Sequence, residues 1–157
     1  IVTDGTYKKN QLELKNEITA DFINMYFSQW EKARDSSRIS DIKLLESAIE
    51  QSYQDYAEYP TQENFTERVL EYLWEIPRDP KENIEINGCK FGYKYEVWND
   101  DNGIENGSYN ISTCFESKNN LVKAENDNWS DTLRYEIWAF INQKMSESFY
   151  IYPCYSF

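Results

Sequence analysis

Histidine is absent from the whole 157-residue sequence. Because histidine is the commonest general base and zinc ligand, its absence excludes Ser-His-Asp and Cys-His catalysis and removes the usual zinc ligand. Pairs of carboxylates remain as candidate catalytic groups. Their spacing is helical, at three or four residues, which indicates solvated charges on a helix face; the pairs are Glu46 with Glu50 and Asp55 with Glu58. We therefore predict that the protein is not an enzyme, while carboxylate and lysine chemistry stay open.

Long apolar runs and positive charge are also scarce. No hydrophobic stretch approaches the roughly 18 residues needed to cross a bilayer. The chain has 16 Lys and Arg against 28 Asp and Glu, for a formal net charge of −12. Such a surface repels phosphate backbones and anionic headgroups, so nucleic acid is not an expected partner. A membrane contact would need an upstream segment that this sequence does not contain.

Glycine and proline are missing between positions 5 and 60. Apolar residues there recur at spacings of three and four, which predicts one long helix from about Asn10 to Tyr56, after an extended lead-in at 1–6. The alternatives are a kink, or a hinge between two antiparallel helices, at Ser36 and Ser37. A helix of about 48 residues would extend roughly 70 Å, so part of it should project or pack on another chain.

Residues 61–157 are predicted to form a globular head, which makes one structural domain with the helix segment 1–60. Thr61 can cap a short helix with Phe65 and Leu73 on one face. Alternating residues then indicate two antiparallel strands. These residues are Phe91, Tyr93, Tyr95 and Val97 in the first strand, and Tyr109, Ile111, Thr113 and Phe115 in the second.

An internal echo at an offset of 40 residues predicts an extra C-terminal β-hairpin. Residues 94–98 (KYEVW) recur as 134–138 (RYEIW), and residues 108–115 recur in part as 148–155. The echo favours strands after Leu133 and a sheet of four or more strands. The alternative is a helix from Leu133 onward, because apolar residues there also recur at helical spacing.

Three motifs carry a family resemblance: ARDSSRISDIK at 33–43, the helix exit Tyr59-Pro60, and IPRDP at 76–80. In this order, over roughly residues 31–117, they resemble type IV pilins and type II secretion pseudopilins. The resemblance implies an α+β fold with a long N-terminal helix packed against an antiparallel sheet. It also implies a structural subunit of an extracellular, cell-surface filament or pseudopilus, whose partners are copies of itself or related pilin subunits.

The start of the chain departs from the pilin pattern. Pilins begin with a hydrophobic helical stem, whereas residues 1–31 here carry charges such as Lys9, Glu13 and Asp21 that do not suit a bilayer. Either a stem lies upstream, or the protein assembles without one.

The long helix supplies the expected assembly interface, because a neighbouring subunit would cover its apolar stripe. The interface residues are Leu14, Ile18, Phe22, Met25, Tyr26, Trp30, Ile39 and Ile42. The competing hypothesis is a cell-surface adhesin or glycan-binding module that uses exposed Trp98, Trp129 and Trp138.

The same helix carries a basic patch. Its members are Lys32, Arg34, Arg38 and Lys43. We expect them to form ion pairs with acidic residues such as Asp35, Asp41 or Glu46, or to meet an acidic surface of a neighbouring subunit. Surface ion pairs of this kind add little stability.

Three cysteines allow one disulfide and leave one thiol over. We favour Cys89–Cys114, because it closes a short hairpin. Cys114–Cys154 is the rival, since the echo places those two residues at matching positions, and three free thiols remain the alternative for a reducing compartment.

No cofactor is expected, with one open case. The loop from Asn99 to Asn106 gathers the oxygen ligands that calcium prefers, and some pseudopilins carry calcium in their sheet region. The spacing is not that of an EF-hand, and Asn-Gly and Asp-Asn-Gly favour a plain hairpin turn.

Overall fold

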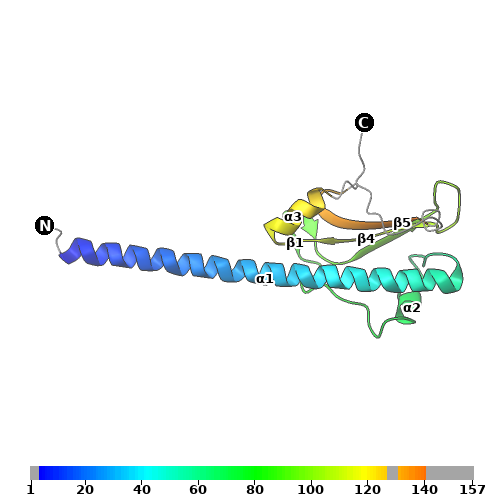
Figure 1. The fold of residues 1–157 in the computed structure, drawn as a ribbon, viewed down its shortest axis with the longest axis horizontal. Coiled ribbons are helices and arrows are strands. Elements are labelled where there is room, and N and C mark those ends of the chain that lie inside the picture. The colour runs from blue at the N-terminus through cyan, green and yellow to red at the C-terminus, as the bar shows by residue number, and fades with distance from the viewer. Residues whose placement is uncertain (1–3, 127–130, 141–157) are drawn as a thin grey trace.

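The computed structural model describes residues 4–126 and 131–140. Its dominant element is α1, Asp4–Tyr56, a single helix of 53 residues that extends about 80 Å (Figure 1). The predicted long helix is thus confirmed, but the expected lead-in over 1–6 is wrong from Asp4 onward, where the chain is already helical. No hinge interrupts the helix: the Ser36 hydroxyl donates a hydrogen bond to the Lys32 carbonyl within an unbroken helical turn.

The two halves of α1 have different surroundings. The C-terminal half packs beneath the sheet, whereas the N-terminal half projects beyond the head (Figure 1). Ile42, Leu45 and Ile49 are at most 1% exposed and form the core with residues of the sheet. Their spacing of three and four places them on one helix face, which explains this packing. Within the described part of the chain, no helix combines the length and apolar character that a bilayer crossing needs.

Three antiparallel strands form the sheet that covers α1. They are β3 (Lys94–Trp98), β4 (Ser108–Cys114) and β5 (Arg134–Phe140), in the order β3-β4-β5. Tyr95 pairs with Ile111, which pairs with Ile137, and all three side chains contact the core. The alternation of these strands therefore points one face at α1, and the α+β class is confirmed.

The C-terminal prediction is confirmed only for its first strand. β5 is a strand, so the alternative of a helix from Leu133 onward is wrong over Arg134–Phe140. β5 adds to the edge of β4, with Ile111 opposite Ile137. The second half of the echo, residues 148–155, lies outside the described residues.

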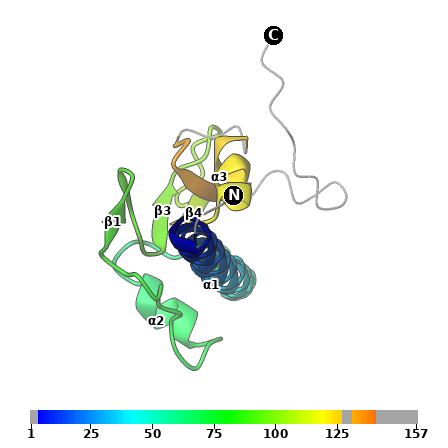
Figure 2. The same ribbon diagram turned by 90° about the vertical axis from the view of Figure 1, so that its left-hand side faces the viewer.

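Shorter elements complete the head. They are α2 (Phe65–Leu70), β1 (Glu85–Ile86), β2 (Cys89–Lys90) and α3 (Lys118–Glu125). Thr61 and Asn64 exchange hydrogen bonds before α2, each side chain accepting from the other's backbone N–H, and Val69 is buried. Viewed along α1, the sheet and α3 lie on one side of the helix and α2 on another (Figure 2).

The favoured disulfide is confirmed: Cys89 is bonded to Cys114. Its position differs from the expectation, because Cys89 lies in the separate β1–β2 hairpin and not at the start of a strand that pairs with β4. The bond therefore ties this small hairpin to the end of β4, where Phe91 packs against both cysteines. Cys154 lies outside the described residues.

Removing the disulfide should destabilise the head. The bond joins residues 25 positions apart, so loop-closure entropy predicts a loss of about 3 kcal/mol for Cys89→Ser with Cys114→Ser. Urea unfolding measures the difference. A reductant should lower the free energy of unfolding of the wild type by a similar amount and leave that of the double variant unchanged. A double variant as stable as the wild type would contradict the prediction.

Candidate assembly surface

The projecting half of α1 carries a ridge of large apolar side chains. Leu14, Ile18, Phe22, Tyr26 and Trp30 follow one another at intervals of four residues, and each is more than half exposed. Such a row runs about 24 Å along the helix and is the kind of ridge that packs into the groove of another helix. We call these five residues the apolar ridge.

The exposure is general in this half of the helix. Nine large apolar residues are about half exposed or more between positions 12 and 30: Leu12, Leu14, Ile18, Phe22, Ile23, Met25, Tyr26, Phe27 and Trp30. Single exposed apolar side chains are ordinary, but a contiguous patch on a soluble protein marks an interaction surface.

The centre of the apolar ridge and the buried face occupy different sides of α1. Twenty residues separate Phe22 from Ile42, and also Met25 from Leu45, so at 100° per residue each pair lies roughly 200° apart around the helix. The middle of the ridge therefore points away from the head. A partner can cover it without displacing the head from the opposite side.

The predicted interface residues therefore fall into an exposed group and a covered group. Leu14, Ile18, Phe22, Met25, Tyr26 and Trp30 are exposed on the projecting half. Ile42, in contrast, is fully buried in the intramolecular core, and Ile39 is half-buried. Ile42 is therefore not available to a neighbouring subunit, because the head already covers it.

A buried ion cluster holds the head where α1 leaves it. Arg38 is 0% exposed and donates two hydrogen bonds to Asp79, from Nε at 2.7 Å and from Nη2 at 3.0 Å. Its Nη1 donates to Asp35 at 2.8 Å, and Nη2 lies 2.8 Å from Glu116. The guanidinium also stacks on Phe91, 4.5 Å from the ring centroid. One side chain thus contacts four others, one within α1 and three in separate segments of the head.

Asp35 positions the start of α3. Its carboxylate accepts hydrogen bonds from the backbone N–H groups of Glu116 and Ser117 at 2.9 Å, and from the Ser117 hydroxyl at 2.7 Å. Ser117 is the N-cap residue of α3. A carboxylate there satisfies unpaired N–H groups and interacts favourably with the helix dipole. α1 therefore fixes where α3 begins, although Asp35 and Ser117 are 82 residues apart.

Glu116 completes the ion cluster. It accepts hydrogen bonds from Arg34 at 2.8 and 2.6 Å and from Lys81 at 2.6 Å. Burial alone would raise the pKa of Glu116, but the hydrogen bonds from Arg34, Lys81 and Arg38 outweigh it and lower the pKa to about 2. The carboxylate is therefore ionised at neutral pH and balances the cations around it.

The expected basic patch is corrected by this geometry. Arg38 is not a surface residue, and Arg34 is paired with Glu116 in the same cluster, with about a quarter of its side chain (26%) exposed. Lys32 and Lys43 remain exposed. The sequence did contain a signal: Asp35 and Arg38 continue the three-and-four spacing of Ile42, and so lie on the buried face.

The loop after β3 is a hairpin turn. Asp100 accepts hydrogen bonds from the backbone N–H groups of Asn102 and Ile104, and Asn99 accepts from that of Asn106. Gly103 has φ +78°, a left-handed conformation that glycine adopts without strain. Among the described residues no group of three His, Cys, Asp or Glu side chains is placed to hold a metal ion. Calcium at this loop stays a prediction.

The tryptophans of the adhesin hypothesis are partly placed. Trp98 and Trp138 pack edge to face, with ring centroids 4.7 Å apart, on the side of the sheet away from α1. Both are half-buried and pack against each other. Trp129 lies outside the described residues.

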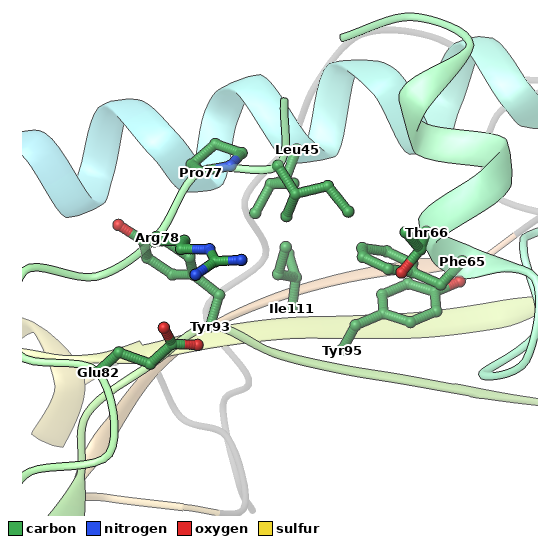
Figure 3. A pocket seen from close by; sticks show the side chains of 10 residues that line it. Leu45, Phe65, Thr66, Pro77, Arg78, Glu82, Tyr93, Tyr95 and Ile111 are labelled. Carbon is green, nitrogen blue, oxygen red and sulfur yellow. The ribbon is translucent and has the colours of Figure 1, made fainter. Parts of the chain in front are cut away.

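A pocket of about 390 Å³ lies between α1, α2 and the sheet (Figure 3). Phe65, Tyr93 and Tyr95 line it with their rings, and Arg78 and Glu82 supply its charged groups. The tyrosine hydroxyls are used elsewhere, because Tyr93 donates to Asp41 and Tyr95 to the Pro60 carbonyl. The pocket therefore presents ring faces together with one cationic and one acidic side chain.

Comparison with protein-family models, with curated proteins and with solved structures gives no match to this chain.

Replacing Arg38 should be far more damaging than replacing an exposed arginine. In Arg38→Met, buried carboxylates lose their common partner, which predicts a loss of about 3–5 kcal/mol in the free energy of unfolding. Arg78→Met is the matched control, because Arg78 is exposed next to Asp79 and should change stability by about 0.5 kcal/mol or less. Urea denaturation followed by circular dichroism measures both, and equal losses would refute the central role of Arg38.

Acid should weaken the ion cluster through Glu116. Its folded pKa of about 2 lies below the ordinary value, so its stabilisation is complete above about pH 4.5 and is lost as the pH falls toward 2. Glu116→Gln should therefore cost about 3 kcal/mol at pH 6. The difference in the free energy of unfolding between Glu116→Gln and the wild type should shrink below pH 4.5.

The check is a series of denaturation curves between pH 2.5 and 7. Glu85→Gln, at an exposed site, should match the wild type throughout. A gap between wild type and Glu116→Gln that stays constant across the series would show that Glu116 is not the titrating group.

Proposed function

We propose that this chain is a non-enzymatic structural subunit that polymerises through the projecting half of α1 into an extracellular pilus-like filament or pseudopilus. Its partners are copies of itself or related subunits. The observation that carries the proposal is the apolar ridge, whose side chains are each more than half exposed and whose centre points away from the head.

Helix physics supports assembly at this place. An isolated helix is marginal in water, and in proteins most helical stability comes from packing of an apolar face. The C-terminal half of α1 has that packing in the core, whereas no residue of the apolar ridge belongs to the core of the described chain and each stays more than half exposed. Helices of neighbouring subunits would supply it and remove the apolar side chains from water.

The charged residues of the projecting half fit helix packing in water. Glu13, Glu17 and Glu31 lie within about 40° of one another around the helix, on a side that the ridge residues Ile18 and Phe22 do not share. A subunit interface can therefore bury the ridge and leave these carboxylates solvated. This arrangement suits assembly without a hydrophobic stem, and it is equally compatible with a stem upstream.

Other features agree with the pilin resemblance. The head sits on the C-terminal half of a long helix, and Asp79 of the IPRDP turn is bound by Arg38 of the ARDSSRISDIK run. Two of the motifs that carry the resemblance thus meet in the ion cluster. The Cys89–Cys114 disulfide favours an oxidising, extracellular location.

Charges placed on the ridge should abolish assembly. We expect the wild type to self-associate and Ile18→Asp with Phe22→Asp to remain monomeric, because desolvating two carboxylates opposes association. Sedimentation velocity and electron microscopy of concentrated samples measure the outcome.

The matched control adds the same two charges to the polar side of the same helix segment. Asn24→Asp with Ser28→Asp should assemble like the wild type, and all three proteins should unfold at similar urea concentrations. The proposal is contradicted if the wild type stays monomeric at its solubility limit, or if the ridge variant assembles normally.

A further inference from the structure

Trp74 is the most exposed apolar side chain of the described head. Its relative exposure is 104%, so the side chain is fully open to solvent. The backbone around it is nevertheless held, because Leu73 donates its N–H to the Val69 carbonyl and packs on the core. The Tyr72 hydroxyl donates to Asp55 of α1. The structure therefore presents an indole on an anchored turn, which is the form of an interface anchor.

A complementary groove lies where α1 leaves the head. It has a volume of about 550 Å³ and is lined by Tyr26, Phe27, Trp30, Glu31, Arg34 and Lys81. Tyr26 and Trp30 meet edge to face, 5.9 Å between centroids. Arg34 and Lys81 are bound to Glu116 beneath, but about a quarter of each side chain is exposed, at 26% and 28%. We call this site the junction groove.

We propose that Trp74 of one subunit inserts into the junction groove of a second copy of the chain. This inference rests on the proposed function and names the contact between successive subunits. The aromatic walls fit an indole, and the exposed cations at the groove suit cation–π contact with it.

The charges around the two surfaces are complementary. Glu71 and Glu75 flank Trp74 and are exposed. At the junction groove the cations are Arg34 and Lys81, which are partly exposed, and the neighbouring Lys32, which is exposed. Glu31 is the one acidic residue among the described residues that line the groove. The carboxylate that neutralises Arg34 and Lys81 is that of Glu116, which is 4% exposed. In a chain with a net charge of −12, this surface is therefore suited to an acidic neighbour.

The distance between Trp74 and the junction groove on one subunit means that the contact must form between subunits. Tyr72 binds α1 at Asp55, whereas the junction groove ends at Arg34, so about 30 Å of helix separate the two surfaces on one subunit. Trp74 therefore cannot fill its own groove. Two different patches that meet head to tail form a heterologous interface, which propagates into a fibre when the rotation does not close.

The test places a photo-crosslinking amino acid, benzoylphenylalanine, at position 74 of the full chain. Irradiation of assembled protein should yield covalent dimers in which position 74 is joined to the peptide 26–34, as mapped by mass spectrometry. Cross-links to any other region would overturn the proposed contact.

Truncating the Trp74 side chain measures how much this contact contributes to self-association. Trp74→Ala should weaken self-association about 10-fold or more in sedimentation equilibrium, since a buried tryptophan anchor dominates an interface. Ile84→Ala, at another half-exposed apolar residue of the head, should have no effect.

The two proposals fail in different ways. If the wild type assembles and the ridge variant does not, but Trp74→Ala assembles at wild-type strength, only the Trp74 contact is refuted. If the wild type does not assemble at all, the filament function and the Trp74 contact fall together.

Discussion

Arg38 is the residue on which the arrangement of this protein depends. Its guanidinium joins α1 to the turn at Asp79 and to Glu116 before α3, while the neighbouring Asp35 caps α3. Buried charges are costly when they are left unpaired, so no member of this cluster can be removed without exposing the others to that cost. The balance of three cations, Arg34, Arg38 and Lys81, against the carboxylates Asp35, Asp79 and Glu116 therefore commits the head to one position on the helix.

That position divides α1 into two parts with different roles. The C-terminal part contributes Ile42, Leu45 and Ile49 to the core, and the N-terminal part is left with its apolar ridge in water. In the proposed filament, ridges of neighbouring subunits pack together while heads remain outside. The proposed contact of Trp74 with the junction groove links the heads to the same helices, so a single chain carries both halves of an open-ended interface.

Local patterns predicted several elements correctly. The helix follows from uninterrupted three-and-four spacing, and β3 and β4 follow from alternation in which Tyr95, Val97, Tyr109 and Ile111 share a face. The sequence also favours the bond between Cys89 and Cys114, which the structure contains. What escaped prediction was short or depends on distant partners: β1 and β2 have two residues each, and α3 starts at a serine held by Asp35. Trp74 and the junction groove were missed because exposure is not a property of sequence.

The sequence by itself determined the length of the helix, the class of the fold and the presence of more apolar surface on α1 than a small head can cover. Periodicity is local, and the chain shows it without reference to distant residues. Only the tertiary structure decided which side of α1 the head covers. That choice follows from contacts over about 40 to 80 residues, between Arg38 and Asp79 and between Asp35 and Ser117, which bury one face and leave the opposite one free.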